Sequence, residues 1–441
     1  MPDRSAYLRA LAPSPFWAVV LAALAARLAW IALVHPRVDL VDDAGFYDFF
    51  AVAIAEGRGY VRPEGVPTAF WPVGYPATLA AVYSLLGHSL LAAKLLNVVL
   101  GAATAGLVYL LARRWFGVKQ SALAGMVYAF FPGAIGFTSL TMSETLFTFL
   151  FIAALYVAAR ASEEEGHELL WAAAFAVIAA AAAYVRGQAL ALPFFAAAWL
   201  LIAGWAWQRA VAFLAVSFAV VVGLSIPWMV RNTIAFGEPT FMSTNAGINL
   251  WLGHHPGADG GFDYHHQLGF TAQFNHLPRV EQEPAWNREG FRQAVRYALT
   301  HPLAELRLSA QKVAKLYMHD HDAIAWNEQN GNSPIFTEPR RTRLAALFDA
   351  YYYAAGLATL AGLGIGLRQR RAWVGPVASA FVLWTLVHVA FFAEPRLHAP
   401  LLPLFAISSS AALVEVVRPL AGAFRRPSLP SAPPESTPTR V

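Results

Sequence analysis

The chain has 441 residues, of which 57% are hydrophobic and 13% charged, and its mean hydropathy is +0.46. This composition excludes an ordinary soluble globular domain, in which about a quarter of the residues are charged. The chain has no cysteine, which excludes a disulfide, a thiolate nucleophile and a cysteine-bound metal. The net charge of +5 comes from short basic clusters between apolar stretches, a pattern that indicates membrane topology rather than nucleic-acid binding.

Recurring apolar stretches predict an all-α polytopic membrane protein with about ten or more transmembrane helices, because stretches of this length cross a hydrocarbon core of roughly 30 Å. The first stretch resembles a secretory signal, but it is too long and carries Arg27, so we expect an uncleaved helix. The stretch from Pro76 to Leu86 is short and predicts an interfacial or re-entrant helix. The predicted spans are residues 16–34, 90–112, 119–137, 143–160, 168–185, 188–207, 209–228, 346–367, 373–392 and 396–417.

The basic clusters predict which ends of the spans face the cytoplasm, since Lys and Arg are enriched in short cytoplasmic loops. With the N-terminus inside, the inner loops contain Arg113, Arg114, Lys119, Arg160, Arg209, Arg368, Arg370, Arg371, Arg418, Arg425 and Arg426. Residues 35–89 and 229–345 are then external. The second segment predicts a mixed periplasmic domain of loop and of an amphipathic helix over Glu289 to Leu316. We expect one membrane domain over residues 1–417, and a disordered, basic, Pro- and Ser-rich cytoplasmic tail over residues 418–441.

The same topology places several ionisable residues at the outer ends of the spans or in the outer segments. Such groups are costly near a bilayer and often functional. Each residue type also has a structural explanation. An Asp can cap a helix, a Glu is stabilised by the positive end of the helix dipole, and an Arg can reach the lipid headgroups. Their common placement nevertheless predicts a site at the outer face. These residues are Asp42, Asp43, Glu144, Arg186, Arg231, Glu394, Arg396 and His398.

Histidines gather in two outer loops and raise the question of a metal. The segment "MHDHD" from Met318 to Asp322 is one of these loops. The other contains His254, His255, Asp259, Asp263, His265 and His266. Their spacing defines no ligand set, so we assign no metal site to either loop and leave a requirement for a divalent metal open.

Ordered sequence blocks resemble bacterial GT-C membrane glycosyltransferases of the protein O-mannosyltransferase and aminoarabinose-transferase (ArnT-like) type. The resemblance covers most of residues 16–417, and the order and spacing of the blocks carry it. The blocks are "DDAGFYDFFAVAIAEGRGY", "PTAFWPVGYP", "AAKLLNVVLGAATAGLVYLLARRWFG", "MSETLF", "VRGQALALP", "PWMVRNTIAFGEPTFMSTNAGINLWLGHHPGADGGF" and "EPRLHAPLLPLFA".

The resemblance implies roles for individual residues. The family carries an essential Asp four residues before an aromatic residue in its first outer loop, which corresponds to Asp43 and Tyr47 and makes Asp43 the expected general base. Glu144 corresponds to a second family acid, and Asp42 is kept as a secondary candidate. Trp71 stands where aminoarabinose transferases have a lysine for the donor phosphate. We therefore expect other cations to bind the donor phosphate, namely Arg186, Arg231 and Arg396. Glu394 and His398 are further candidate site residues.

The resemblance also implies a function: inverting transfer of a sugar from a polyprenyl-phosphate donor to lipid A, another glycolipid, a glycan or a protein. Outward-facing acids fit this donor, because nucleotide sugars stay in the cytoplasm. The expected place is the outer face of a bacterial cytoplasmic membrane, with the polyprenyl tail near Phe130 to Phe137. Two alternatives stay open: a transporter or flippase of a lipid-linked sugar, for which Arg27 and Lys94 are the charges within spans, and a protein that only binds polyprenyl phosphate.

Overall fold

The computed structural model describes residues 14–34, 42–163, 166–329 and 335–423, and these residues are almost entirely helical. Within them, β pairing is limited to an isolated bridge between Val61 and Pro67. The bundle helices are α2 (Pro15–Val34), α5 (Leu90–Ala112), α6 (Val118–Ala129), α8 (Glu144–Ala161), α9 (Glu168–Val185), α10 (Leu192–Ile202), α11 (Trp207–Phe236), α17 (Glu338–Arg368), α18 (Val374–Ala390) and α19 (Leu402–Ala423). The other elements are α3 (Asp42–Ala55), α4 (Gly74–Leu86), α7 (Pro132–Gly136), η1 (Phe137–Ser139), η2 (Gly187–Ala191), α12 (Ala246–Leu252), α13 (Tyr264–Ala272), α14 (Arg279–Thr300), α15 (Pro302–Leu316), α16 (Asp322–Gln329) and η3 (Pro395–Leu401).

All ten predicted spans coincide with apolar helices, but the predicted count of ten or more transmembrane helices is not confirmed. In the described part of the chain, seven helices are long and apolar enough to cross a membrane: α2, α5, α8, α9, α11, α17 and the stretch Pro395–Val416. A helix pair bent by 55°, α6 with α7 and η1, makes an eighth if it is one span. The stretches Gly187–Ile202 and Val374–Ala390 are shorter. The 17 residues of α18 extend only about 26 Å as a helix, less than the roughly 30 Å of a hydrocarbon core.

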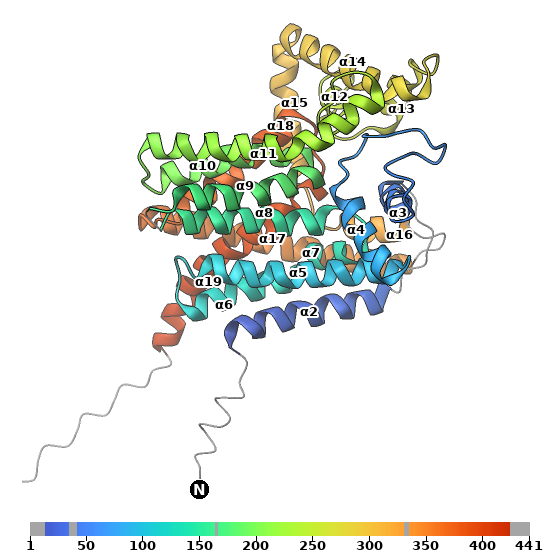
Figure 1. Cartoon of the computed structure of the whole chain (residues 1–441). Helices are drawn as coiled ribbons and strands as arrows, with labels where there is room; N and C mark the ends of the chain where they lie inside the picture. Colours follow the sequence, from blue (N-terminus) through green and yellow to red (C-terminus); the bar gives the residue numbers. More distant parts are fainter. Residues whose placement is uncertain (1–13, 35–41, 164–165, 330–334, 424–441) are drawn as a thin grey trace, which may run out of the picture.

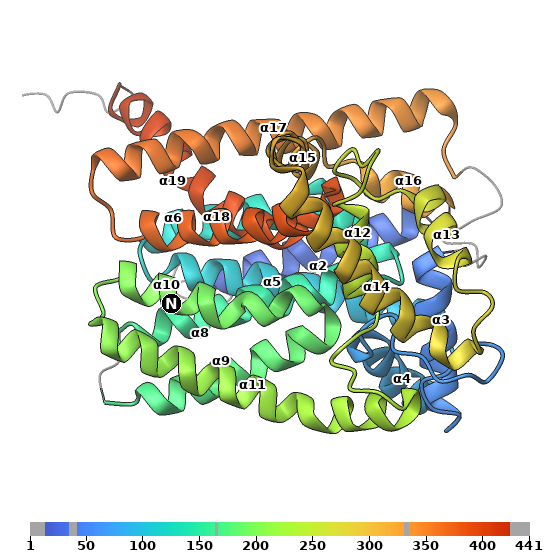
Figure 2. The same ribbon diagram turned by 90° about the horizontal axis from the view of Figure 1, so that it is seen from above.

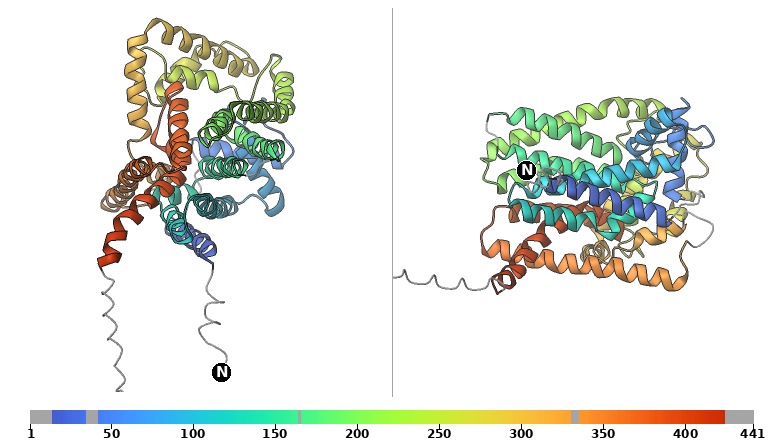
Figure 3. Two further views of the ribbon diagram at one scale, coloured as in Figure 1. Left: turned by 90° about the vertical axis from the view of Figure 1, so that its left-hand side faces the viewer. Right: turned by 90° about the horizontal axis from the view of Figure 1, so that it is seen from below.

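The long helices lie side by side in one bundle, and the left panel of Figure 3 shows many of them nearly end-on. Helices α3, α4 and α16 lie at one end of the bundle, and α12 to α15 lie to one side of it near that end (Figures 1 and 2). Two basic loops of the opposite end form the ion pairs Arg114–Glu163 and Arg209–Glu168. The helices that are long and apolar enough to cross a membrane make the chain a multi-pass membrane protein. Which end faces the cytoplasm stays a prediction.

Small residues let the bundle helices approach one another closely. Helix α9 is rich in alanine and packs against both α8 and α11. Helix α17 runs along α19, and a Cβ atom at Gly362 would overlap the backbone of Ser408. Lipid tails are as apolar as leucine, so close packing of this kind, rather than hydrophobic burial, stabilises helix contacts inside a membrane.

A helix break lies between α6 and α7, within the predicted tail-binding stretch. Helix α6 ends before Phe130, and Pro132 starts α7 because proline suits the first turn of a helix. The side chain of Arg27, which is buried in the bundle, donates from Nη1 to the carbonyl oxygens of Ala23 and Ala129. This arginine therefore has a structural partner at the end of α6.

The stretch predicted to be interfacial or re-entrant forms α4, which has 13 residues and is not among the candidate spans. It packs against α3 and α5. Residues 229–345 hold α12 to α16 and the first turns of α17, so the helix predicted over Glu289 to Leu316 is instead two helices. The break falls at Pro302, which has no N–H and begins α15.

The buried side chain of Glu283 joins the two predicted outer segments. Its Oε1 accepts hydrogen bonds from Arg62 Nε (2.7 Å) and Thr68 Oγ1 (2.6 Å). Its Oε2 accepts from the backbone N–H of Ala69 (3.0 Å) and from Thr244 Oγ1 (2.8 Å). These bonds fix the loop after α3 against helix α14.

Candidate active site

Asp43 lies in the first turn of α3, at the end of the bundle that carries most of the predicted site residues. Its Oδ2 lies 3.2 Å from Nη1 of Arg396, which belongs to η3. The Asp43 side chain keeps 27% of its surface exposed, whereas Arg396 keeps 11%. A carboxylate that is both paired and reachable therefore stands at this end of the bundle.

Glu144 is the first residue of α8 and is almost fully buried. Its Oε1 accepts a 2.5 Å hydrogen bond from Nη2 of Arg186, the residue that ends α9. The same oxygen lies 3.9 Å from Arg396 Nη1. The other oxygen, Oε2, has no hydrogen-bond partner among the described residues. Arg186 also donates from Nε to Ser143 Oγ (2.9 Å), which orients its guanidinium.

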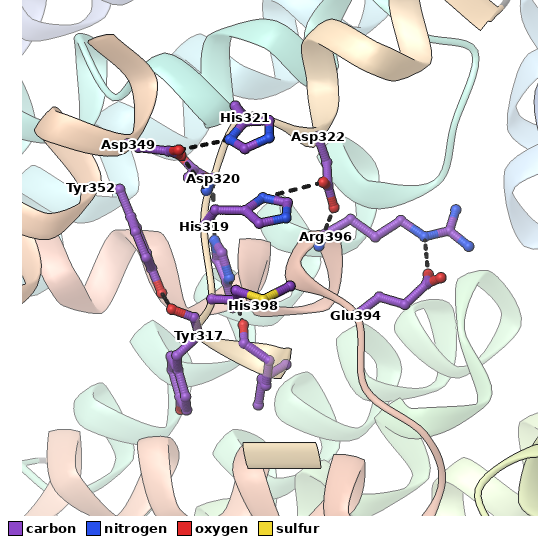
Figure 4. Close-up of polar contacts among 12 residues, drawn as sticks. Tyr317, His319, Asp320, His321, Asp322, Asp349, Tyr352, Glu394, Arg396 and His398 are labelled. Carbon is purple, nitrogen blue, oxygen red and sulfur yellow. Dashed lines mark hydrogen bonds and ion pairs between the residues drawn. The ribbon is translucent and has the colours of Figure 1, made fainter. Parts of the chain in front are cut away.

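Arg396 is held from several sides, as the close-up in Figure 4 shows in part. Its Nε donates to Glu394 Oε2 (2.8 Å), and its backbone N–H donates to Asp322 Oδ2 (3.1 Å). Its guanidinium carbon lies 4.7 Å from the ring centre of Trp326. These contacts orient the guanidinium toward Asp43.

We call Asp43, Glu144, Arg186, Glu394 and Arg396 the carboxylate–arginine cluster. It joins three carboxylates to two guanidinium groups, and Arg396 contacts all three acids. A carboxylate can accept a proton, and a guanidinium can bind a phosphate through two parallel hydrogen bonds. The cluster thus offers the groups for removing a proton next to groups for holding a phosphate.

Aromatic side chains lie beside the cluster on α3, on α4 and on the segment between these helices. Tyr47 is buried, with ring centres 5.4 Å from Tyr75 and 6.3 Å from Trp71. Trp71 stacks on the more exposed Phe46 at 4.8 Å. Burial and, to a smaller extent, the Asp43 carboxylate raise the pKa of Tyr47 above its usual value. Tyr47 therefore stays an uncharged phenol at neutral pH.

Two of the predicted site residues make their contacts elsewhere. Arg231 donates to the carbonyl oxygens of Tyr60 and Thr68, at 2.7 Å each, and so holds the loop after α3. His398 is buried and binds Asp320 Oδ1 through Nε2 (3.0 Å). Asp42 begins α3, but its side chain lies outside the described residues. The predicted roles of these three residues stay predictions.

Sequence reasoning missed some residues that position the cluster. Asp322 was noted only as part of a histidine-containing segment, yet it accepts the backbone N–H of Arg396. Trp326 contacts Arg396, and Ser143 accepts a hydrogen bond from Arg186. Neither role was predictable, because a single Trp or Ser in an apolar chain most often has a packing or capping role. The distance of 74 residues between Asp322 and Arg396 hides their contact from any local pattern.

The outer histidines make two separate sets of contacts. His254 pairs with Glu305 (Nδ1 to Oε2, 2.7 Å) and contacts the buried ammonium of Lys312 (3.0 Å). Burial lowers the pKa of Lys312 to about 8. In the segment Met318 to Asp322, His319 and His321 lie near Asp349 of α17. Burial lowers the pKa of His319 below its usual value, so its ring is neutral at neutral pH.

A family comparison matches part of the chain. Residues 71–229, less than half of the chain, match the sequence profile of the dolichyl-phosphate-mannose-protein mannosyltransferases. No curated protein sequence matches the chain. The matched range includes Glu144 and Arg186 but not Asp43 or Arg396.

Solved structures show the fold. The archaeal oligosaccharyltransferase AglB from Archaeoglobus fulgidus, solved with an inhibitory peptide and a dolichol-phosphate, is 15% identical, with a TM-score of 0.56 over 94% of this chain and 52% of that one. The chain thus spans about half the length of that relative. ArnT from Cupriavidus metallidurans, bound to undecaprenyl phosphate, is 15% identical, with a TM-score of 0.47 over 93% of this chain and 81% of that one. The predicted GT-C fold is confirmed by the likeness to AglB.

Proposed function

We propose that this GT-C-fold membrane protein is a glycosyltransferase that moves a sugar from a polyprenyl-phosphate donor to an acceptor hydroxyl. The observation that carries the proposal is the carboxylate–arginine cluster, in which Asp43 and Glu144 share Arg396. The family match over residues 71–229 and the GT-C fold support it. The acceptor is a lipid, a glycan or a protein.

Asp43 is the proposed general base. Its carboxylate takes the proton of the acceptor hydroxyl while the acceptor oxygen forms a bond to the anomeric carbon of the sugar. The bond from that carbon to the phosphate oxygen breaks, and polyprenyl phosphate leaves with the bonding electrons. The single displacement inverts the anomeric configuration. General-base help of this kind typically accelerates a reaction about 10² to 10⁴-fold.

Arg186 and Arg396 are the proposed partners of the departing phosphate. Their guanidinium groups stabilise the negative charge that develops on it, and Glu144 keeps both groups in place. Arg231, which donates to carbonyl oxygens of the loop after α3, is a third predicted phosphate ligand. The donor's apolar tail would lie among the helices, in contact with the membrane.

The proposed location is the outer face of a bacterial cytoplasmic membrane. The basic loops at the far end of the bundle support it, because such loops stay in the cytoplasm. AglB was solved with a dolichol-phosphate, which is a lipid phosphate of the class that the proposed reaction releases. The transporter reading is weaker, because Arg27, one of the two charges within spans, binds the backbone carbonyl at the end of α6.

The test is release of free polyprenyl phosphate from a panel of polyprenyl-phosphate sugars by the purified full-length protein with native membrane extract. Wild type should release it, and Asp43→Asn should reduce the rate by about 10² to 10⁴-fold. Asp259→Asn is the matched control, because this acid is mostly exposed and pairs with Lys315 outside the cluster.

A folded Asp43→Asn variant with wild-type release would contradict the assignment of the base. Absence of release with every donor and extract would contradict transfer and favour transport or simple binding. A product with retained anomeric configuration would contradict the single displacement.

A further inference from the structure

The segment from Met318 to Asp322 follows α15 and ends at the first residue of α16, and Figure 4 shows its polar side chains. Asp320 points inward: its carboxylate accepts the backbone N–H of Gly133 (3.1 Å) and bonds to His398 (3.0 Å). A Cβ atom at residue 133 would overlap this carboxylate, so a larger residue there would displace Asp320. The segment is therefore firmly anchored by its central residue.

His319 and His321 flank that anchor, and their rings stack with centres 4.0 Å apart. Asp349 of α17 faces them: its Oδ1 accepts the backbone N–H of Asp320 (3.0 Å), and its Oδ2 lies 2.7 Å from His321 Nδ1. One ligand atom from each of His319, His321 and Asp349 can be chosen so that all lie within 4.8 Å of one another. Figure 4 shows the three side chains converging from two chain segments.

The hydrogen-bonding capacity of the two histidines is not fully used by the described residues. His319 Nδ1 is buried and makes no hydrogen bond within the described residues, although it lies 3.3 Å from Asp322 Oδ1. The side chains of His321 and Asp349 keep 33% and 21% of their surface exposed, so an ion can reach them from outside. The two imidazoles and the carboxylate are held in place and can be reached from outside. They are therefore suited to binding a metal ion.

The chemistry of these metal-ligand atoms indicates which kind of ion would bind. Imidazole nitrogen suits zinc, copper, nickel and iron, whereas magnesium and calcium prefer sites built only from oxygen. Two His ligands with one carboxylate, and water at the remaining position, form a common zinc arrangement. Ligand atoms at roughly 2.0 to 2.2 Å from zinc lie about 3.5 Å apart, so small side-chain movements close the observed group around an ion.

We propose that His319, His321 and Asp349 bind one divalent transition-metal ion of the zinc type, at a site separate from the carboxylate–arginine cluster. Asp322 ties this site to the cluster, because it lies beside His319 and also accepts the backbone N–H of Arg396. The ion fixes the segment that positions Arg396. It supplies no group to the proposed transfer step.

The test uses full-length protein purified in detergent with an affinity tag free of histidine, and stripped with a chelator. Cobalt(II) is titrated into it and followed by its visible ligand-field absorption, and zinc(II) is then used to displace the cobalt. Wild type should bind one equivalent. His321→Ala and Asp349→Asn should each weaken binding by about tenfold or more.

The variants and controls separate this site from others. Asp349→Asn keeps an oxygen that can accept the backbone N–H of Asp320, so its fold should survive, and zinc should raise the melting temperature of wild type but not of this variant. His265→Ala, in the other histidine loop, should bind like wild type. Equal binding by wild type, His321→Ala and Asp349→Asn would overturn the proposal, as would a wild type that binds no cobalt or zinc. The titration needs no donor or acceptor, so its outcome is independent of the proposed transfer.

Discussion

Two buried glutamates, Glu144 and Glu283, differ in how many of their carboxylate oxygens have hydrogen-bond partners. Both oxygens of Glu283 are hydrogen-bonded, to partners that hold two outer segments together. Glu144 has one oxygen on Arg186, while the other has no hydrogen-bond partner among the described residues. A buried polar atom without a partner costs about 1 to 3 kcal/mol, so folds rarely keep one without a use. The contrast indicates a structural role for Glu283, and it fits the role proposed for Glu144 beside the two arginines.

After the loss expected for Asp43→Asn, replacing Glu144 should cause the next largest effect on activity. Glu144→Gln keeps the shape but removes the charge that holds Arg186 and faces Arg396, so release of polyprenyl phosphate should fall roughly 100-fold. The melting temperature in detergent should also fall, because the Glu144–Arg186 ion pair is almost fully buried, so release is measured at a temperature at which the variant is folded. A variant with wild-type release and a strongly lowered melting temperature would place Glu144 with Glu283 as a structural acid.

Arg396→Lys should reduce release by about tenfold or more. An ammonium cannot donate in the fixed fork with which Arg396 contacts both Asp43 and Glu394. Initial rates over a range of donor concentrations measure the effect. Arg288→Lys, at an exposed arginine that pairs with Glu238, is the control and should keep the wild-type rate. Equal rates for both variants would remove Arg396 from the proposed site.

Glu283→Gln should lower the free energy of unfolding by about 1 to 3 kcal/mol, because Arg62 loses its ion pair and one amide cannot serve all four donors. Thermal unfolding in detergent measures this change. The control is Glu289→Gln at an exposed ion pair with Arg292, where the expected change is about 0 to 1 kcal/mol. Equal losses in the two variants would contradict the role of Glu283 as the joint between the outer segments.

The smallest predicted effect is a pH dependence at Lys312, whose folded-state pKa of about 8 lies below the usual 10.5. Between these values the unfolded chain holds a proton that the folded chain has released, so stability should rise with pH over this window. Below pH 8 both states are protonated and the difference is constant. Lys312→Met should therefore show a smaller rise in melting temperature from pH 8 to 10 than wild type, with Lys315→Met as the neighbouring control. Parallel curves for wild type and Lys312→Met would contradict the shifted pKa.

Much of the candidate site was predictable, because charged residues of a membrane protein are rare within the spans and gather at their ends. Asp43, Glu144, Arg186, Glu394 and Arg396 stood out as ionisable residues at the ends of apolar stretches, and the structure brings these five together. Arg231 and His398 carried the same signal, yet they bind a loop backbone and a buried aspartate. Position at a helix end restricts a residue to one face of the membrane but does not select its partner on that face.

The sequence by itself determined the helical membrane class and the segments that form the bundle, because the apolar length needed to cross a bilayer is visible along the chain. It did not determine how many of those segments are full spans, since the 55° bend after α6 and the 17-residue length of α18 are seen only in the folded chain. Only the tertiary structure decided that Asp349 faces His319 and His321, and that Asp322 holds Arg396. Both depend on contacts between distant segments, and the position of α17 and η3 in the bundle is set by packing that no local pattern encodes.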